Sequence, residues 1–179
     1  MLEKDLAEFS AGKHMPAVIC SSLAGSQWSF ERSLVSRIPT MPSGTVTGTA
    51  SFTTIFSNES GDKELLFSEQ GSFVTDSGLK LEVSAFYVYV YSAEKDSLEI
   101  FFADKETHSK KDYLFVPLKL QASATGWTAS AFHRCSADGY QAEFTFAMKG
   151  LKVREIVANF DVSGPHKDYF SHTIFKSKN

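Results

Sequence analysis

From Trp28 almost to the end of the chain, apolar side chains recur at every second position. The clearest run occupies alternate positions of one segment: Leu79, Leu81, Val83, Ala85, Tyr87, Tyr89 and Tyr91. A period of two puts these side chains on one face of a β-strand, whereas a helix needs a period of about 3.6. The pattern therefore predicts a fold built almost entirely of strands.

The strand-like runs are separated by short segments with turn chemistry, such as SNESGD, TDSG, SADG and SGPHKD. Short links join antiparallel neighbours, so about ten runs predict an up-and-down meander. A flat sheet of this size leaves two exposed edges, which closure into a barrel removes. We therefore expect an all-β fold, a single antiparallel up-and-down barrel of about ten strands. Such a barrel is wide enough to hold a small ligand.

The first residues follow a different pattern. Leu2, Leu6 and Phe9 are spaced as on one face of a helix. The sequence thus predicts an N-terminal helical cap over residues 1–24 and a β-barrel domain over residues 25–179. A chain of 179 residues is long enough for one sizeable core.

The charge balance argues against several classes of partner. The chain has 18 basic and 21 acidic residues, and its one short basic cluster is SKKD at 109–112. Nucleic acids and anionic membrane surfaces need a positive face, so we expect neither as a partner. No apolar run is long enough for a membrane span, so none is predicted. Nothing in the sequence sets the oligomeric state.

The chain begins MLEKDLAEF, which lacks the apolar segment of a secretory signal. Its two cysteines, Cys20 and Cys135, are expected to be free thiols in a reducing compartment. We therefore predict a soluble, cytoplasmic protein.

The usual metal and nucleotide motifs (C-x-x-C, H-E-x-x-H, G-x-G-x-x-G) are missing, so no metal and no cofactor are predicted.

Two charged residues share the apolar face of their strands. Arg32 follows Trp28 and Phe30 at alternate positions, and Glu69 follows Phe67 in the same way. A buried charge needs a partner, water or a ligand. Three alternatives follow: the two residues form an internal ion pair that braces the barrel, they touch a bound polar ligand, or a different register places them outside.

A second acidic pair has a less certain register. Glu155 and Asp161 share one face of their strand with Val153 and Val157. The opposite face is formed by Ile156, Phe160 and Val162. The first pattern would place both carboxylates inside, and the second would place them outside.

The stretch FHRCSADGY at 132–140 concentrates reactive side chains. In a strand, His133 and Cys135 point the same way, and Asp138 and Gly139 suit a tight hairpin turn. The favoured interpretation is structural: His133 hydrogen-bonds across the hairpin to Asp138 or Tyr140, and Cys135 fills core. The alternatives are a contact at a ligand site and a Cys–His nucleophile pair.

Two single residues invite comparison with known barrels. Calycin sequences begin with a Gly-x-Trp motif at the first strand. Gly25 and Trp28 resemble this motif but are one residue further apart. Trp28 is expected to plug the core. Nitrobindin-like barrels hold haem through one late histidine, a place that His172 occupies. However, His172 shares its face with Phe170 and Ile174, so a structural or surface role is favoured.

The chain resembles the family called domain of unknown function 6314 over about residues 22–177. The resemblance rests on short motifs in order: Leu23, Gly25, Trp28 and Arg32; Gly48, Ala50 and Phe52; Glu69 and Gly71; Tyr87 and Tyr89; Phe101, Phe102 and Asp104; His133, Cys135, Asp138 and Tyr140; Gly164, Pro165, Lys167, Asp168 and Tyr169. It implies a calycin-type barrel. The family's Phe-His pair after FF-x-D is replaced here by Phe115-Val116, which leaves the role of that histidine open; His108 is a candidate to replace it.

The resemblance and the alternation together select two sets of residues. The candidate ligand-binding residues, in the cavity or at its mouth, are Arg32, Glu69, Tyr87, Tyr89, His133, Tyr140 and Lys167. The candidate structural residues are Trp28, Asp138, Gly139, Gly164 and Pro165.

Three functions fit this pattern. The first is a barrel that binds a small hydrophobic or amphipathic molecule. The second is a cofactor-independent enzyme, such as an isomerase, cyclase or hydrolase, in which Arg32, Glu69 and His133 act together in the cavity. The third is an accessory module that binds a partner through an outward apolar patch of Phe86, Val88 and Val90.

Overall fold

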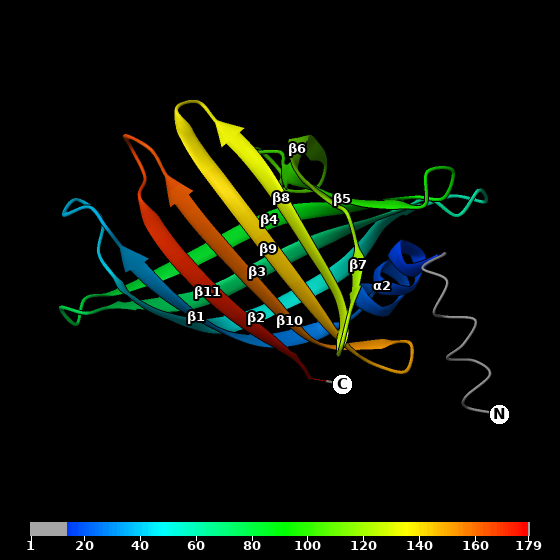
Figure 1. Cartoon of the computed structure of the whole chain (residues 1–179), viewed down its shortest axis with the longest axis horizontal. Coiled ribbons are helices and arrows are strands. Elements are labelled where there is room, and N and C mark those ends of the chain that lie inside the picture. Colours follow the sequence, from blue (N-terminus) through cyan, green and yellow to red (C-terminus); the bar gives the residue numbers. More distant parts are fainter. Residues whose placement is uncertain (1–13, 179) are drawn as a thin grey trace.

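A computed structural model describes residues 14–178 of the chain. Within this range one helix precedes eleven strands, which form a single sheet (Figure 1). The elements are α2 (Met15–Leu23), β1 (Gln27–Ser36), β2 (Gly44–Ser57), β3 (Lys63–Thr75), β4 (Lys80–Ser92), β5 (Ser97–Ala103), β6 (Lys111–Leu118), β7 (Gln121–Ser123), β8 (Gly126–Cys135), β9 (Asp138–Lys149), β10 (Lys152–Ser163) and β11 (Tyr169–Ser177).

The strands run in the order β6-β5-β4-β3-β2-β1-β11-β10-β9-β8-β7. All pairs are antiparallel, and the pairing of β1 with β11 joins the two halves of the meander. The sheet curls into a half-barrel (Figure 1). The all-β, up-and-down architecture predicted from the alternation is confirmed, and the curled sheet is consistent with the calycin-type barrel that the family resemblance implied. The strand beyond the expected ten is β7, which is only three residues long.

The ladder of paired strands does not close completely among the described residues. Its end strands are β6 and β7, and β6 lies beside β8 without a paired register. Because β5 has only seven residues, it pairs with β4 from Tyr87 to Ser92 alone. Residues 80–86 of β4 therefore pair only with β3, and this end of the curl stays open.

Helix α2 covers one end of the curl (Figure 1). Its Ile19, Cys20 and Leu23 are fully buried in the same apolar cluster as Trp28. The indole Nε1 of Trp28 donates to Ser26 Oγ at 2.8 Å. The connections β1–β2, β3–β4, β8–β9 and β10–β11 lie at the ends away from α2 (Figure 1). The helix expected from Leu2, Leu6 and Phe9 lies outside the described residues.

The structure decides the register of β10. A bulge between Val153 and Glu155 shifts the pairing with β9, so Ile156 and Ala158 continue the inward face that Val153 begins. Glu155 and Asp161 consequently do not share the buried face. The interpretation that put them inside with Val153 and Val157 is wrong, because strict alternation fails at a bulge.

The hairpin after β8 is tighter than the sequence indicated. Asp138 and Gly139 belong to β9, where they pair with Cys135 and Arg134. The turn is Ser136-Ala137, with Ser136 in the left-handed region at φ 57°. The expected assignment of Asp138 and Gly139 to the turn is therefore wrong. Serine accepts a positive φ here because the strand pairing on both sides holds it.

Candidate functional site

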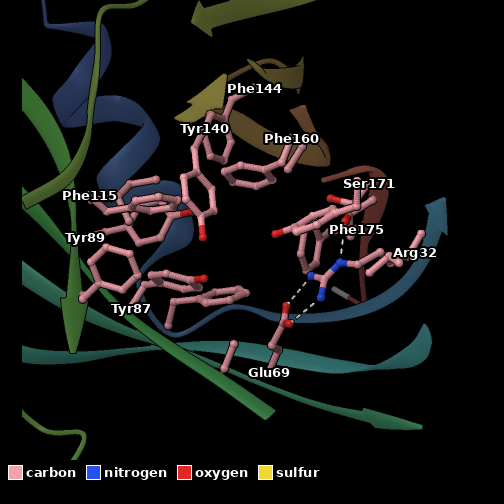
Figure 2. Close-up of a pocket in the computed structure, with 18 of the residues that line it drawn as sticks. Arg32, Glu69, Tyr87, Tyr89, Phe115, Tyr140, Phe144, Phe160, Ser171 and Phe175 are labelled. Carbon is pink, nitrogen blue, oxygen red and sulfur yellow. Dashed lines mark hydrogen bonds and ion pairs between the residues drawn. The ribbon is translucent and has the colours of Figure 1, made fainter. Parts of the chain in front are cut away.

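The inner face of the half-barrel lines a partly open cavity of about 260 Å³. Six phenylalanines line it, each from a different strand: Phe67, Phe102, Phe115, Phe144, Phe160 and Phe175. Figure 2 shows Tyr87, Tyr89 and Phe115 on one side of the pocket, with Arg32 and Ser171 on the other. Alternation explains this convergence, since each strand turns its aromatic face towards the same interior.

The aromatic walls pack against one another as flat surfaces. The ring of Phe115 stacks on Tyr87 at 5.6 Å and 17° and on Phe160 at 5.7 Å and 12°. Phe67 meets Phe175 edge to face at 5.8 Å. Rings with few free torsions form a rigid lining, which suits a flat, mostly apolar molecule.

Arg32 and Glu69 form an internal ion pair, which was one of the alternatives that the sequence left open. Arg32 Nη1 and Nη2 donate to the two carboxylate oxygens of Glu69 at 2.8 and 2.9 Å (Figure 2). Arg32 Nε donates to Thr173 Oγ1 at 2.8 Å. Glu69 is only 4% exposed. The bidentate geometry satisfies the buried carboxylate, and both residues still line the cavity.

Three tyrosines bring hydroxyls to the cavity without a hydrogen-bond partner in the described part of the chain: Tyr87, Tyr89 and Tyr169. Burial raises the pKa of each of them above the ordinary value. They therefore stay protonated at neutral pH. A neutral phenol can both donate and accept a hydrogen bond, so these hydroxyls are free to meet a ligand.

Lys167 reaches the cavity from the β10–β11 loop. Its Nζ donates to the Tyr140 hydroxyl at 3.0 Å, and this hydrogen bond raises the pKa of Lys167. The loop is fixed beside it. Arg37 Nη1 donates to Asp168 Oδ1 at 2.9 Å, and the Arg37 backbone N–H donates to the Asp168 carbonyl at 2.9 Å. The β10–β11 loop, which carries Lys167, lies at the end of the curl away from α2 (Figure 1).

Asp138 holds the same loop from the other side. The Asp138 side chain is buried, and its Oδ1 accepts the backbone N–H of His166 at 3.1 Å. Gly164 lies so close that an added Cβ would sit 2.6 Å from Asp138 Cα. Pro165 is exposed in the loop, and Gly139 faces the exposed ring of Phe132. Four of the five predicted structural residues therefore lie in or beside the β10–β11 loop: Asp138, Gly139, Gly164 and Pro165. The fifth, Trp28, packs beside α2.

His133 is the one candidate ligand residue that does not line the cavity. Its ring packs edge to face on Phe115 at 5.3 Å, at the place where β8 lies beside β6. Burial lowers the pKa of His133, and a hydrogen bond with the Phe115 backbone partly offsets this. The prediction that His133 hydrogen-bonds to Asp138 or Tyr140 is wrong. Asp138 instead accepts a hydrogen bond from the His166 backbone, and Tyr140 accepts one from Lys167.

His172 is on the outward face of β11. Its Nδ1 lies 2.6 Å from Asn159 Oδ1, and Phe170 on the same face is exposed. The face predicted from the sequence is confirmed. A haem ligand inside the barrel would have to come from the other face, so the arrangement does not support the haem interpretation.

Sequence reasoning did not select several lining residues. Tyr169, Ser171 and Thr173 line the cavity together with Phe175. The available signal was their alternation with Phe175, which places them on one face of β11. No local motif marks Phe115, Phe144 or Phe160, because only the curl of the sheet brings them to the cavity.

The described residues contain no group of three or more His, Cys, Asp or Glu side chains that could hold a metal ion. Across residues 14–178 no helix is both long and apolar enough to cross a membrane. The candidate site combines an aromatic cavity, the ion pair of Arg32 with Glu69, three tyrosine hydroxyls and Lys167 on the β10–β11 loop.

The chain belongs to the family of unknown function DUF6314, whose model matches residues 23–177. The matched range covers α2 from its last residue and all eleven strands. No curated protein and no solved structure matches the chain. The family resemblance inferred from the short motifs is thereby confirmed.

Proposed function

We propose that this member of the DUF6314 family binds a small, mostly apolar molecule in the cavity of its half-barrel. The observation that carries the proposal is the cavity itself, about 260 Å³ in volume and walled by aromatic rings. Sites for small molecules are typically concave and mostly apolar, with a few polar groups that fix the ligand's orientation. The aromatic cavity, with Arg32, Glu69 and Lys167 in its lining, fits that description.

The volume limits the class of ligand. A dry apolar cavity of about 150 Å³ is enough to hold benzene. A cavity of about 260 Å³ therefore suits one or two rings rather than a long chain or a large cofactor. The stacked pair of Phe115 and Tyr87 favours a planar body.

The polar lining supports an amphipathic rather than a purely apolar ligand. The hydroxyls of Tyr87, Tyr89 and Tyr169 have no hydrogen-bond partner among the described residues. Each hydroxyl faces the cavity and can both donate and accept a hydrogen bond, so polar substituents on a ligand would find partners there. We place this binding protein in the cytosol, which agrees with its two free cysteines.

The arrangement favours neither of the other two functions. An enzyme using Arg32, Glu69 and His133 needs these groups to converge, yet Arg32 and Glu69 bind each other and His133 lies outside the cavity lining. A partner-binding patch of Phe86, Val88 and Val90 needs exposure, yet Val88 is fully buried and Phe86 stacks on His108 at 4.3 Å.

Calorimetric titration with 2-naphthamide, a neutral two-ring probe, tests the proposal. Ala85→Trp places a large side chain in the cavity, because Ala85 lines it. Ser84→Trp is the matched control, since the neighbouring Ser84 is exposed on the outer face of the same strand. We expect binding by the wild type and by Ser84→Trp, and a loss of at least about tenfold in affinity for Ala85→Trp.

Equal binding by all three proteins would place the probe outside the cavity and contradict the proposal. Native mass spectrometry supplies an independent test. A stoichiometric extra mass on the wild type that disappears on denaturation, and is missing from Ala85→Trp, supports carriage of a natural ligand.

A further inference from the structure

The charges around the cavity do not cancel. The charged lining residues are Arg32, Glu69 and Lys167, which amount to two cations and one carboxylate. Arg32 and Glu69 neutralise each other through two hydrogen bonds. The charge of Lys167 is therefore left over.

Lys167 has no acidic partner in residues 14–178. Its Nζ donates to the Tyr140 hydroxyl, and it lies 5.7 Å from the centre of the Tyr140 ring. The neighbouring carboxylate of Asp168 is taken by Arg37 at 2.9 Å. Asp138 uses its Oδ1 to hold the His166 backbone instead. Two nearby carboxylates thus fix the loop and leave the ammonium free to face a ligand.

The hydrogen-bonding groups beside Lys167 are mainly donors. The Tyr140 hydroxyl accepts from Lys167, so its own proton remains available. The hydroxyl of Tyr169 has no partner within the described chain, and burial raises its pKa, so it also keeps its proton. An ammonium with two phenol donors matches an oxyanion better than a cation or a hydrogen-bond donor.

We propose that the ligand is a small one- or two-ring carboxylate, whose anionic group binds Lys167 and the Tyr140 hydroxyl at the mouth while its rings lie among the aromatic walls. This inference rests on the proposed function and names the ligand class for the same cavity. Because Lys167 is exposed, the head group stays near water and only the ring body is buried. The arrangement avoids the cost of burying a second charge deep in the barrel.

The test compares two probes of the same shape, 2-naphthoate and 2-naphthamide, by calorimetry at pH 7.5. At this pH the naphthoate is ionised, so the two probes differ mainly in charge. We expect the wild type to bind naphthoate about tenfold more tightly, a modest factor because Lys167 is exposed. Lys167→Met should remove this preference, and Lys167→Arg should restore most of it.

Lys149→Met is the matched control, since Lys149 is an exposed lysine at the opposite end of β9 from Tyr140. It should keep the preference for naphthoate. Tyr140→Phe should weaken naphthoate binding more than naphthamide binding, because it removes a donor without changing the walls.

The outcomes separate the two proposals. If both probes bind with equal affinity and Lys167→Met changes neither, the cavity binds ligands but the anionic class is wrong. If neither probe binds the wild type, the proposed function fails and the ligand class fails with it. Equal losses for Lys167→Met and Lys149→Met would indicate a general charge effect and would also overturn the assignment to Lys167.

Discussion

Arg32 on β1 and Glu69 on β3 bind each other across the intervening strand β2, at distances of 2.8 and 2.9 Å. Arg32 is paired with Val46 of β2, and Ala50 of β2 is paired with Glu69. Gly48 lies between these two positions on the same face. A Cβ at Gly48 would collide with the backbone of Gln70 and Gly71, so the glycine lets β2 and β3 approach closely at the point that the ion pair spans.

Arg32→Met should lower the free energy of unfolding by about 3 kcal/mol, because it leaves the buried Glu69 carboxylate without its partner. The double variant Arg32→Met/Glu69→Met should recover more than half of this loss, since no unpaired charge remains. Urea unfolding of both variants at neutral pH measures the difference. A double variant as unstable as Arg32→Met would show that the cost is lost packing rather than an unpaired charge.

Gly164→Ala should destabilise the fold by about 2 kcal/mol, in the range of overpacked positions. The added Cβ would sit 2.6 Å from the backbone Cα of Asp138, which cannot move without disturbing the β8–β9 hairpin. Gly139→Ala is the control, because the closest contact of its Cβ would be the exposed ring of Phe132 at 3.1 Å, which can rotate, while the backbone of Ser163 lies at an ordinary 3.8 Å. Thermal unfolding that ranks Gly139→Ala as equally unstable would contradict the assigned contact.

His133 should make stability depend on pH. Burial lowers its pKa below the ordinary value of 6.5, so between the two pKa values the unfolded chain binds more protons than the folded chain. The free energy of unfolding therefore rises with pH through this window. The contribution is complete above about pH 6.5 and is lost as the pH falls through the folded-state pKa.

His133→Phe, which keeps an aromatic ring beside Phe115, should flatten the dependence between pH 5 and 7 in urea unfolding. His166→Gln should leave it unchanged, because the His166 side chain is exposed. An identical pH profile for His133→Phe and the wild type would refute a role for His133 in this dependence.

The two thiols should differ in reactivity. Cys20 is fully buried on α2, and burial raises its pKa to about 11, whereas Cys135 is half-buried. Because the thiolate is the reactive form, iodoacetamide at pH 8 should modify Cys135 first. Cys20 should react only in denaturant. Peptide mapping by mass spectrometry checks the order, and modification of Cys20 at the rate of Cys135 in native buffer would show that α2 opens readily.

The alternation of side chains was sufficient to predict the strands, their antiparallel order and the inward face of most of them. The ion pair of Arg32 with Glu69 was one of the alternatives that the sequence offered, because a charge on an apolar face needs a partner, water or a ligand; only the structure decided between them.

The sequence left two registers open for Glu155 and Asp161, and a bulge that it does not signal decided between them. The assignment of Asp138 and Gly139 to the turn failed because the turn is two residues long rather than four. At the bulge, one extra residue reverses the face of every later side chain in the strand. The length of the turn is set by how far the pairing of β8 with β9 extends, which composition alone does not fix.

The sequence by itself determined that the chain forms an antiparallel, curled sheet with an aromatic interior, since a period of two is a local property of each strand. Only the tertiary structure decided that Lys167 stands beside Tyr140, that Asp138 holds the loop of Gly164, and that His133 packs at the seam between β6 and β8. These contacts join residues distant in the chain. They depend on how far the sheet curls, which is set by packing across the whole barrel.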